Sequence, residues 1–158
     1  MRNSILWSWI VIMAMVSVGV CGCDSNTVYF HFCHTPLSGW EKNDTLTFCV
    51  PGVRQQGSYN QEIMLRTTDE FPYKSISLIV EQTILPAGHT TCDTIKCMVS
   101  DNNGNIKGNG ISIYQNQFKT KNLKLNANDS LHIKIRHAMR REMMPGVSDV
   151  GIRISMDQ

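Results

Sequence analysis

The sequence predicts an all-β fold, a single antiparallel β-sandwich of about eight or nine strands. Short segments in which apolar and polar residues alternate recur along the chain, as strands with one buried face require. Clusters of Gly, Pro, Asn and Asp separate these segments, and no apolar stripe of helical period is long enough for a core helix. The pattern does not distinguish a jelly-roll topology from an immunoglobulin-like one.

The first four strands are defined by alternation and by the turns that end them. Residues 28–34 (VYFHFCH) begin the fold, and residues 44–50 (DTLTFCV) alternate until Pro51-Gly52 ends the strand. Residues 59–67 (YNQEIMLRT) form another extended run. The clearest strand is residues 73–84 (YKSISLIVEQTI), where one face consists of Ile76, Leu78 and Val80.

The second half of the chain continues this pattern. The next four strands are expected at residues 91–100, 111–118, 123–125 and 130–137. Between the first two, residues 101–105 (DNNGN) predict a hairpin turn because Asn-Gly suits positive φ. In the strand at 130–137, Leu131, Ile133 and Ile135 face inward. A short helical turn is expected at residues 138–144, and the strand at 147–155 closes the fold with Val150, Ile152 and Ile154 on one face.

The N-terminal segment predicts a lipoprotein signal peptide over residues 1–22. A single Arg precedes an apolar run of 16 residues at positions 5–20, which is shorter than the roughly 20 residues of a spanning helix. The small Gly22 immediately precedes Cys23, an arrangement that resembles a bacterial lipobox. We therefore expect cleavage before Cys23 and lipidation of its thiol. Residues 23–27 would be a lipidated tether and residues 28–158 the sandwich domain.

Charge and cysteine content narrow the possible functions. The mature chain would have 136 residues, with 14 basic and 13 acidic side chains, so its net charge of +1 gives no electrostatic case for nucleic acid binding. An exported protein can retain disulfides, but Cys92 and Cys97 would face opposite sides of one regular strand, which argues against a bond between them. Four cysteines allow three pairings, and free thiols and disulfides both remain open for Cys33, Cys49, Cys92 and Cys97.

No residue pattern nominates a catalytic, metal or cofactor site. Two loose groups, His31, Cys33 and His34, and His89, Cys92 and Cys97, lack the spacing of zinc ligands. The turn at residues 101–105 has Asp and Asn at alternate positions, but it lacks the Gly and Glu that a calcium loop needs. Asp69, Glu70 and Asp149 have no partner that spacing makes suitable for acid–base chemistry. We expect no enzymatic activity.

Two surface hypotheses remain. The first concerns a local basic stretch, which could contact anionic headgroups or an acidic partner. On a strand, the same residues would simply form a polar outer face. The stretch comprises His132, Lys134, Arg136, His137, Arg140 and Arg141. A sandwich can also bind glycans on exposed aromatic side chains, although core packing is the more common role of such residues. The candidate aromatic platforms are Trp40, Tyr59, Tyr73 and Tyr114.

The last third of the chain carries a specific pattern. Its most distinctive part is residues 144–153 (MPGVSDVGIR), which follow Ala138-Met139-Arg140. Together with residues 93–95 (DTI), residues 101–110 (DNNGNIKGNG) and the N-terminal residues 23–26 (CDSN), this pattern resembles the gliding motility lipoprotein GldH family of Bacteroidetes. The resemblance extends over essentially the whole chain in order and length.

The resemblance implies a non-catalytic lipoprotein of the cell envelope. It would be an accessory component of the gliding motility machinery and of the secretion system associated with it, held at the membrane by lipid on Cys23. The outer membrane is the expected location, on either its periplasmic or its surface side. Other envelope proteins are the expected partners, no small-molecule substrate or cofactor is implied, and a lipid-anchored glycan-binding module is the alternative. For Pro145-Gly146 and Asp149, we expect a tight turn and hydrogen bonds to turn amides.

Overall fold

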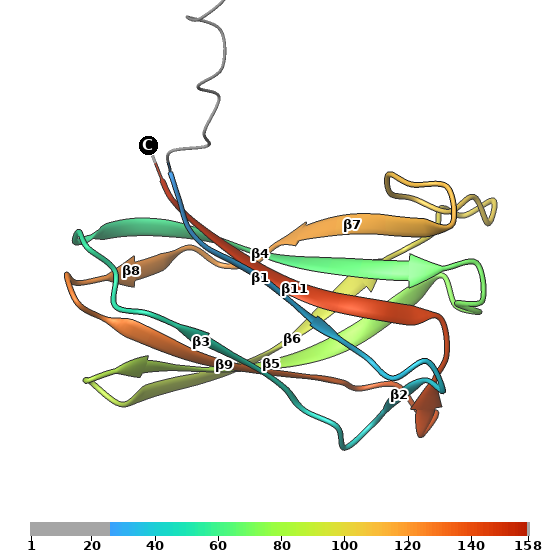
Figure 1. The fold of residues 1–158 in the computed structure, drawn as a ribbon, viewed down its shortest axis with the longest axis horizontal. Helices are drawn as coiled ribbons and strands as arrows, with labels where there is room; N and C mark the ends of the chain where they lie inside the picture. The colour runs from blue at the N-terminus through green and yellow to red at the C-terminus, as the bar shows by residue number, and fades with distance from the viewer. Residues whose placement is uncertain (1–25, 158) are drawn as a thin grey trace, which may run out of the picture.

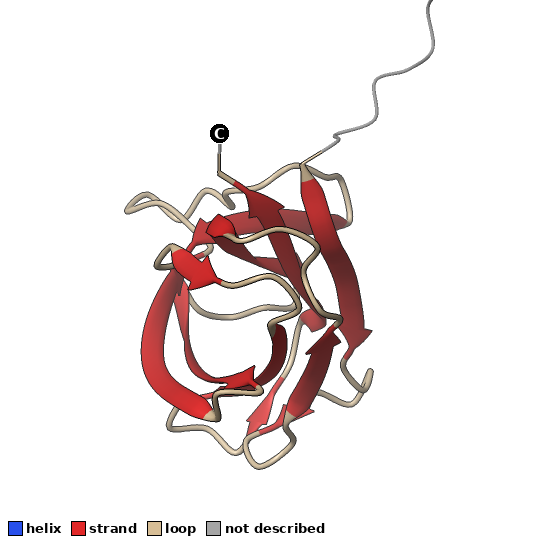
Figure 2. Ribbon diagram, turned by 90° about the vertical axis from the view of Figure 1, so that its left-hand side faces the viewer, coloured by secondary structure: helices blue, strands red, loops and turns tan. Residues whose placement is uncertain are grey.

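The computed structural model describes residues 26–157 and confirms the all-β fold. Two antiparallel sheets pack face to face, with the start of β1 and the end of β11 at the same end of the molecule (Figure 1). Strands and loops account for all of the fold drawn in Figure 2. In the part of the chain that the structure describes, no helix is long and apolar enough to cross a membrane.

Each sheet has a defined strand order. The first sheet consists, in spatial order, of β1 (Thr27–His34), β11 (Val147–Met156), β4 (Gly57–Thr68) and β7 (Ile113–Lys119), with β8 (Leu123–Leu125) also paired to β4. The second sheet consists of β3 (Leu46–Val50), β9 (Ser130–His137), β5 (Ser75–Leu85) and β6 (His89–Met98). A separate two-stranded ribbon pairs β2 (Trp40–Glu41) with β10 (Met143–Met144).

The order of the strands is that of a jelly roll. Strands from the two halves of the chain pair from the outside inward, β1 with β11, β3 with β9, β4 with β7 and β8, and β5 with β6. This is one long hairpin rolled up so that successive pairs lie alternately in the two sheets. The structure therefore resolves the choice between jelly-roll and immunoglobulin-like topology in favour of the jelly roll.

The core lies between the sheets and contains the predicted inward faces. Each of the three predicted triplets, on β5, β9 and β11, is buried: Ile76, Leu78 and Val80; Leu131, Ile133 and Ile135; Val150, Ile152 and Ile154. Burying each such side chain contributes about 1.5–3 kcal/mol before entropy is counted. The largest fully buried side chains of the core are those of Trp40, Tyr59 and Phe48.

The prediction of a helical turn at residues 138–144 is wrong. The chain bends there and then forms β10, which pairs with β2 through Met144 opposite Trp40. The backbone N–H of Lys42 donates to the carbonyl of Glu142 over 2.8 Å, and Met144 is fully buried. Long-range pairing and burial thus override the helical propensity of this short segment.

The predicted turns are confirmed. An antiparallel bridge joins Ser100 to Ile106 across the turn at residues 101–105, and Gly104 has a φ of +89°. The carboxylate of Asp101 accepts hydrogen bonds from the backbone N–H groups of Asn103 and Asn105 and from the Asn105 amide. These bonds, led by the one from the Asn105 side chain, lower the pKa of Asp101. Gly146, with a φ of +75°, forms the tight turn that was expected after Pro145.

Candidate functional site

The distinctive block near the C-terminus presents one row of side chains on the outside of the first sheet. Because side chains alternate along β11, burial of Val150, Ile152 and Ile154 in the core places Asp149, Gly151 and Arg153 on the outer face. Strand β1 aligns His34, Phe32 and Phe30 with these three residues, and β4 aligns Arg66, Met64 and Glu62 with them. We call Phe32, His34, Glu62, Arg66, Asp149, Gly151 and Arg153 the outer-face cluster.

Phe32, Gly151 and Arg66 form the middle of the outer-face cluster. A Cβ atom at Gly151 would lie 2.7 Å from two atoms of the Phe32 ring, so only glycine allows the ring to lie this close to β11. The guanidinium of Arg66 lies 3.9 Å from the centre of the same ring, within cation–π distance. Arg66 also donates through Nε to Oε1 of Gln115 over 3.0 Å. Gly151 thus permits a close approach of β1 to β11 that a side chain at this position would obstruct.

Asp149 is the buried charge of the cluster, with only 4% of the residue exposed. Its Oδ1 contacts Nδ1 of His34, and its Oδ2 accepts a 2.7 Å hydrogen bond from the Ser148 hydroxyl. The guanidinium Nη1 of Arg66 lies 3.9 Å from the same Oδ2. The structure thus corrects the expectation that Asp149 would bond turn amides. It also supplies two partners that sequence spacing did not nominate, His34 and Arg66, because they come from other strands.

Arg153 and Glu62 form the other end of the cluster. Arg153 Nη1 lies 3.8 Å from Glu62 Oε2, and Nε and Nη2 approach the Thr27 hydroxyl at 3.3 and 3.2 Å. Beside them, Phe30 is 57% exposed and its ring meets that of Phe32 edge-on, with 5.5 Å between centroids. The cluster is therefore a network of paired charges bordered by an exposed aromatic ring on an edge strand.

The histidine and cysteine groups do not converge on a metal site. His31 and Cys33 share one side of β1, with His31 against the Phe48 ring and Cys33 Sγ 3.8 Å from the Thr47 carbonyl, whereas His34 turns to Asp149. Within residues 26–157, no three His, Cys, Asp or Glu side chains are arranged to hold a metal ion.

All four cysteines of the described range are free thiols. Cys92 is exposed and Cys97 is buried, so the prediction that they face opposite sides of β6 is confirmed. Burial raises the pKa of the Cys97 thiol to about 12 and also raises the pKa of Cys33.

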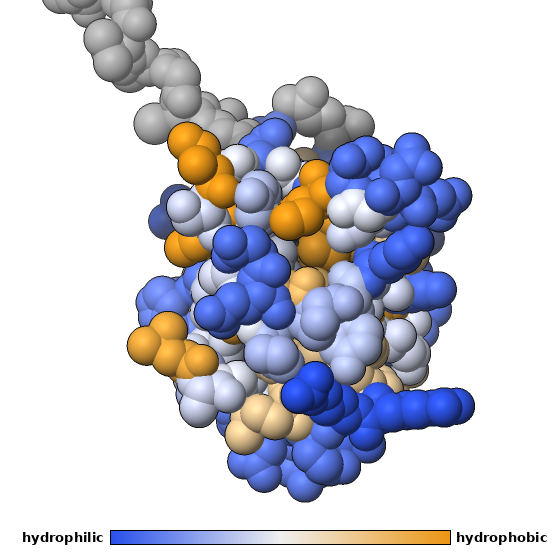
Figure 3. All heavy atoms as spheres, turned by 90° about the vertical axis from the view of Figure 1, so that its right-hand side faces the viewer, coloured by the Kyte–Doolittle hydropathy of each residue, from blue (hydrophilic) through white to orange (hydrophobic). Residues whose placement is uncertain are grey.

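The candidate aromatic platforms lie largely inside the fold. Trp40 and Tyr59 are buried in the core, and Tyr73 and Tyr114 are half-buried. Apolar side chains are exposed elsewhere, Leu37 and Ile111 almost completely. On the face drawn in Figure 3, however, the apolar patches are separated by hydrophilic surface, so they form no continuous platform.

The basic stretch is only partly a surface. His132, Lys134 and Arg136 point outward from β9, as predicted, and Arg140 and Arg141 are exposed in the following loop. The Nζ atom of Lys134 lies 3.8 Å from Oε1 of Glu81, so part of the positive charge of this stretch is paired. His137, by contrast, is fully buried and its Nε2 donates to the Trp40 carbonyl over 3.1 Å. His137 must therefore be removed from the basic surface.

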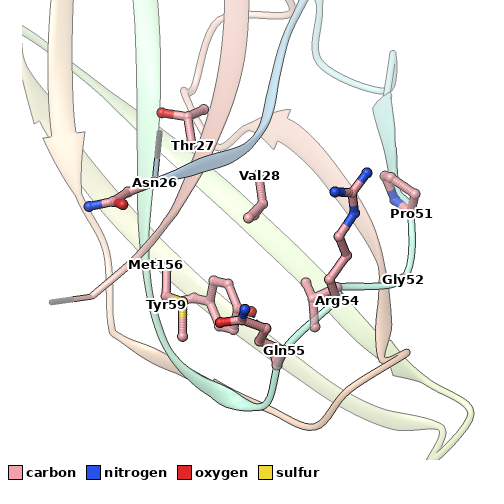
Figure 4. A pocket seen from close by; sticks show the side chains of 10 residues that line it. Asn26, Thr27, Val28, Pro51, Gly52, Arg54, Gln55, Tyr59 and Met156 are labelled. Atoms are coloured by element: carbon pink, nitrogen blue, oxygen red, sulfur yellow. Dashed lines mark hydrogen bonds between the residues drawn. The ribbon is translucent and has the colours of Figure 1, made fainter. Parts of the chain in front are cut away.

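A cavity of about 730 Å³ lies at the end of the sandwich where β1 begins (Figure 4). We call it the tether cavity, because Asn26, Thr27 and Val28 form one wall of it. The loop from Pro51 to Gln55 forms the opposite wall, with Tyr59 and Met156 between them. No sequence signal pointed to this cavity, since its walls come from three separate parts of the chain. Cys23, the predicted lipidation site, lies outside the described residues.

Two solved structures illustrate how far the fold resembles known proteins. A family GH115 4-O-methyl-α-glucuronidase is 12% identical, with a TM-score of 0.44, over 86% of this chain and 18% of its own. A family 35 carbohydrate-binding module from Clostridium thermocellum is 12% identical, with a TM-score of 0.40, over 84% of this chain and 93% of its own. At these scores the likeness supports no statement about function.

The sequence comparisons are more specific. A gliding motility lipoprotein GldH from Flavobacterium johnsoniae is 26% identical over 152 residues, which cover 90% of this chain and 93% of the relative. The model of the GldH lipoprotein family matches residues 27–154, a range that includes all of both sheets except the last two residues of β11, and the whole outer-face cluster. The chain belongs to the GldH lipoprotein family.

Proposed function

We propose that this protein is a non-catalytic lipoprotein of the cell envelope that serves as an accessory component of the gliding motility machinery and its associated secretion system. The observation that carries the proposal is the family match over residues 27–154, together with the name of the Flavobacterium relative. Lipid on Cys23 would hold the sandwich at the outer membrane. Residues 1–22 would be removed, and residues 23–27 would link the lipid to β1.

The outer-face cluster supports a binding role rather than a catalytic one. The Ser148 hydroxyl donates to Asp149 and not to His34, so the His34–Asp149 pair does not activate that hydroxyl as a nucleophile. Arg66 is paired with Asp149 and Arg153 with Glu62, so these charges are directed at partners within the cluster. A polar surface of paired charges with an exposed ring such as Phe30 at its border suits recognition of another envelope protein.

The proposal can be tested in cells that carry the natural gene or a Cys23→Ser variant. We expect the wild-type protein to sediment with outer membranes and its processing to stop in globomycin, and we expect Cys23→Ser to lose both membrane association and function in colony spreading. Crosslinking in intact cells should recover components of the gliding or secretion machinery. Recovery of only abundant, unrelated lipoproteins would overturn the assembly role, and unchanged processing in globomycin would overturn the anchor.

A further inference from the structure

The tether cavity is placed where the proposed anchor would bring it against the membrane. Cys23 lies three residues before Asn26, and three residues span at most about 11 Å. The headgroup layers add roughly 10–15 Å in total to a hydrocarbon core of about 30 Å. A lipid on Cys23 would therefore hold the mouth of the cavity at or just above the headgroups.

The loop that forms the far wall of the cavity is fixed to the rest of the sandwich. Val53 donates its N–H to the Asp129 carbonyl over 2.9 Å, and its own carbonyl accepts the N–H of Asn128 over 2.7 Å. The Tyr59 hydroxyl donates to the Gln55 carbonyl over 2.6 Å. Arg54 lies between these two anchored residues, so its backbone is held in place before any ligand arrives.

Arg54 differs from Arg66 and Arg153 because it has no counter-charge among the residues that the structure describes. Both of those arginines lie near a carboxylate on the outer face, whereas no carboxylate of residues 26–157 lies within 4.0 Å of the Arg54 guanidinium. Figure 4 shows the Arg54 side chain extending from its loop into the space between Val28 and Pro51. A guanidinium of this kind is well suited to bind a phosphate group through two parallel hydrogen bonds.

Apolar side chains near the cavity are suited to contact with a membrane surface. Val28 lines the cavity and is 42% exposed. Phe30 is 57% exposed on the outer face of the same strand, beyond the irregularity in register between Thr27 and Tyr29. Exposed aliphatic and aromatic residues beside a cation are characteristic of protein surfaces that lie in the membrane interface. The charge and the apolar residues therefore favour the same occupant.

We propose that the tether cavity binds the phosphate of a membrane phospholipid headgroup through Arg54, and that this contact seats the sandwich on the membrane in one orientation. The inference rests on the proposed lipid anchor at Cys23. Three residues of tether alone would leave the domain free to turn. A second contact close to the anchor would restrict that rotation and keep the outer-face cluster in one direction relative to the membrane.

The test uses the full-length protein in its native membranes, with a photoreactive phenylalanine analogue in place of Val28. After irradiation, mass spectrometry of the purified protein measures phospholipid adducts at this position. We expect adducts in the wild-type background and roughly a tenfold loss with Arg54→Glu, because a charge-assisted phosphate contact is replaced by repulsion. Arg54→Lys should retain part of the signal. The matched control, Arg136→Glu on the second sheet, should leave it unchanged.

Three results would overturn the proposal. Equal adducts in the wild-type and Arg54→Glu backgrounds would show that the cavity does not select a phosphate. Crosslinks from position 28 to residues 23–25 would show that the tether itself fills the cavity. Loss of the adducts on addition of inorganic phosphate, with phosphate retained on the protein, would assign the site to the free anion.

The intact mass of the same samples separates this inference from the proposed function. If Cys23 carries lipid and no phospholipid adduct forms, the headgroup contact is refuted and the anchor is retained. If Cys23 carries no lipid, the anchor is refuted and the headgroup contact is refuted with it.

Discussion

The ring of Phe32 lies so close to Gly151 that a methyl group on the glycine would be 2.7 Å from two ring carbons. This contact joins an N-terminal edge strand to the C-terminal strand on the outer face of the first sheet. It brings together the first strand and the most distinctive sequence block of the chain. The outer-face cluster is thus held by packing at its centre and by charge pairs at both ends.

Replacing Gly151 with Ala should destabilise the fold by about 1–3 kcal/mol, because the new methyl group forces the Phe32 ring away from β11. Chemical denaturation of the purified domain measures the free energy of unfolding. In a Phe32→Ala background the same substitution should cost much less, since the obstructing ring is gone. Equal losses in the two backgrounds would show that the Phe32–Gly151 contact does not determine the requirement for glycine.

Replacing Asp149 with Asn should destabilise the fold by about 1–3 kcal/mol, because His34 and Arg66 lose the carboxylate that they approach. The same substitution should reduce crosslinking to partner proteins if the cluster is the binding surface. Asp69→Asn is a suitable control, because Asp69 is exposed in the loop after β4. A variant at position 149 that matched this control in both stability and crosslinking would contradict the assigned role of the cluster.

Alternation predicted the strands because burial of one sheet face is a local property of the sequence. The triplets on β5, β9 and β11 could therefore be assigned inward before any pairing was known. The pairing itself joins residues far apart in the chain, such as His34 with Asp149, and periodicity contains no information about it. For this reason the sandwich was predictable, whereas the jelly-roll order was not.

The same distinction explains what was missed at the candidate site. The sequence block around Asp149 and Gly151 was recognisable, but its partners Phe32 and Arg66 come from other strands. His137 looked like one more basic surface residue because it ends a run of alternating charges, yet alternation itself places it on the inward side of β9. Because side chains alternate with a period of two, the last residue of this strand belongs to the inward face.

Stability should fall as the pH drops from 7 to 5.5, and His137 should account for part of the decline. Burial lowers the pKa of His137 from its ordinary 6.5, so the folded protein binds a proton on this ring less readily than the unfolded chain does. Below pH 6.5 the unfolded chain takes up a proton that the folded chain does not bind, which favours unfolding; above that value the contribution is constant.

The variant His137→Gln can retain a donor to the Trp40 carbonyl but does not titrate, so its unfolding free energy should depend less on pH over this range. His132→Gln, at an exposed position on the same strand, is the matched control. Denaturation curves at pH 7, 6.5, 6 and 5.5 provide the comparison. If the unfolding free energy of His137→Gln depended on pH as steeply as that of the wild type, His137 would not be the source of the pH dependence.

Alkylation should distinguish the exposed cysteines of the described range from the buried one. Cys49 and Cys92 are exposed and should react with iodoacetamide in the native protein at neutral pH. Cys97 should stay unmodified, because burial both excludes the reagent and raises the pKa of its thiol to about 12. Peptide mass spectrometry before and after unfolding in urea gives the extent of reaction at each position, and Cys97 should react only after unfolding. Native labelling of Cys97 at the rate of Cys92 would contradict its place in the core, and a Cys92–Cys97 disulfide would contradict their positions on opposite faces of β6.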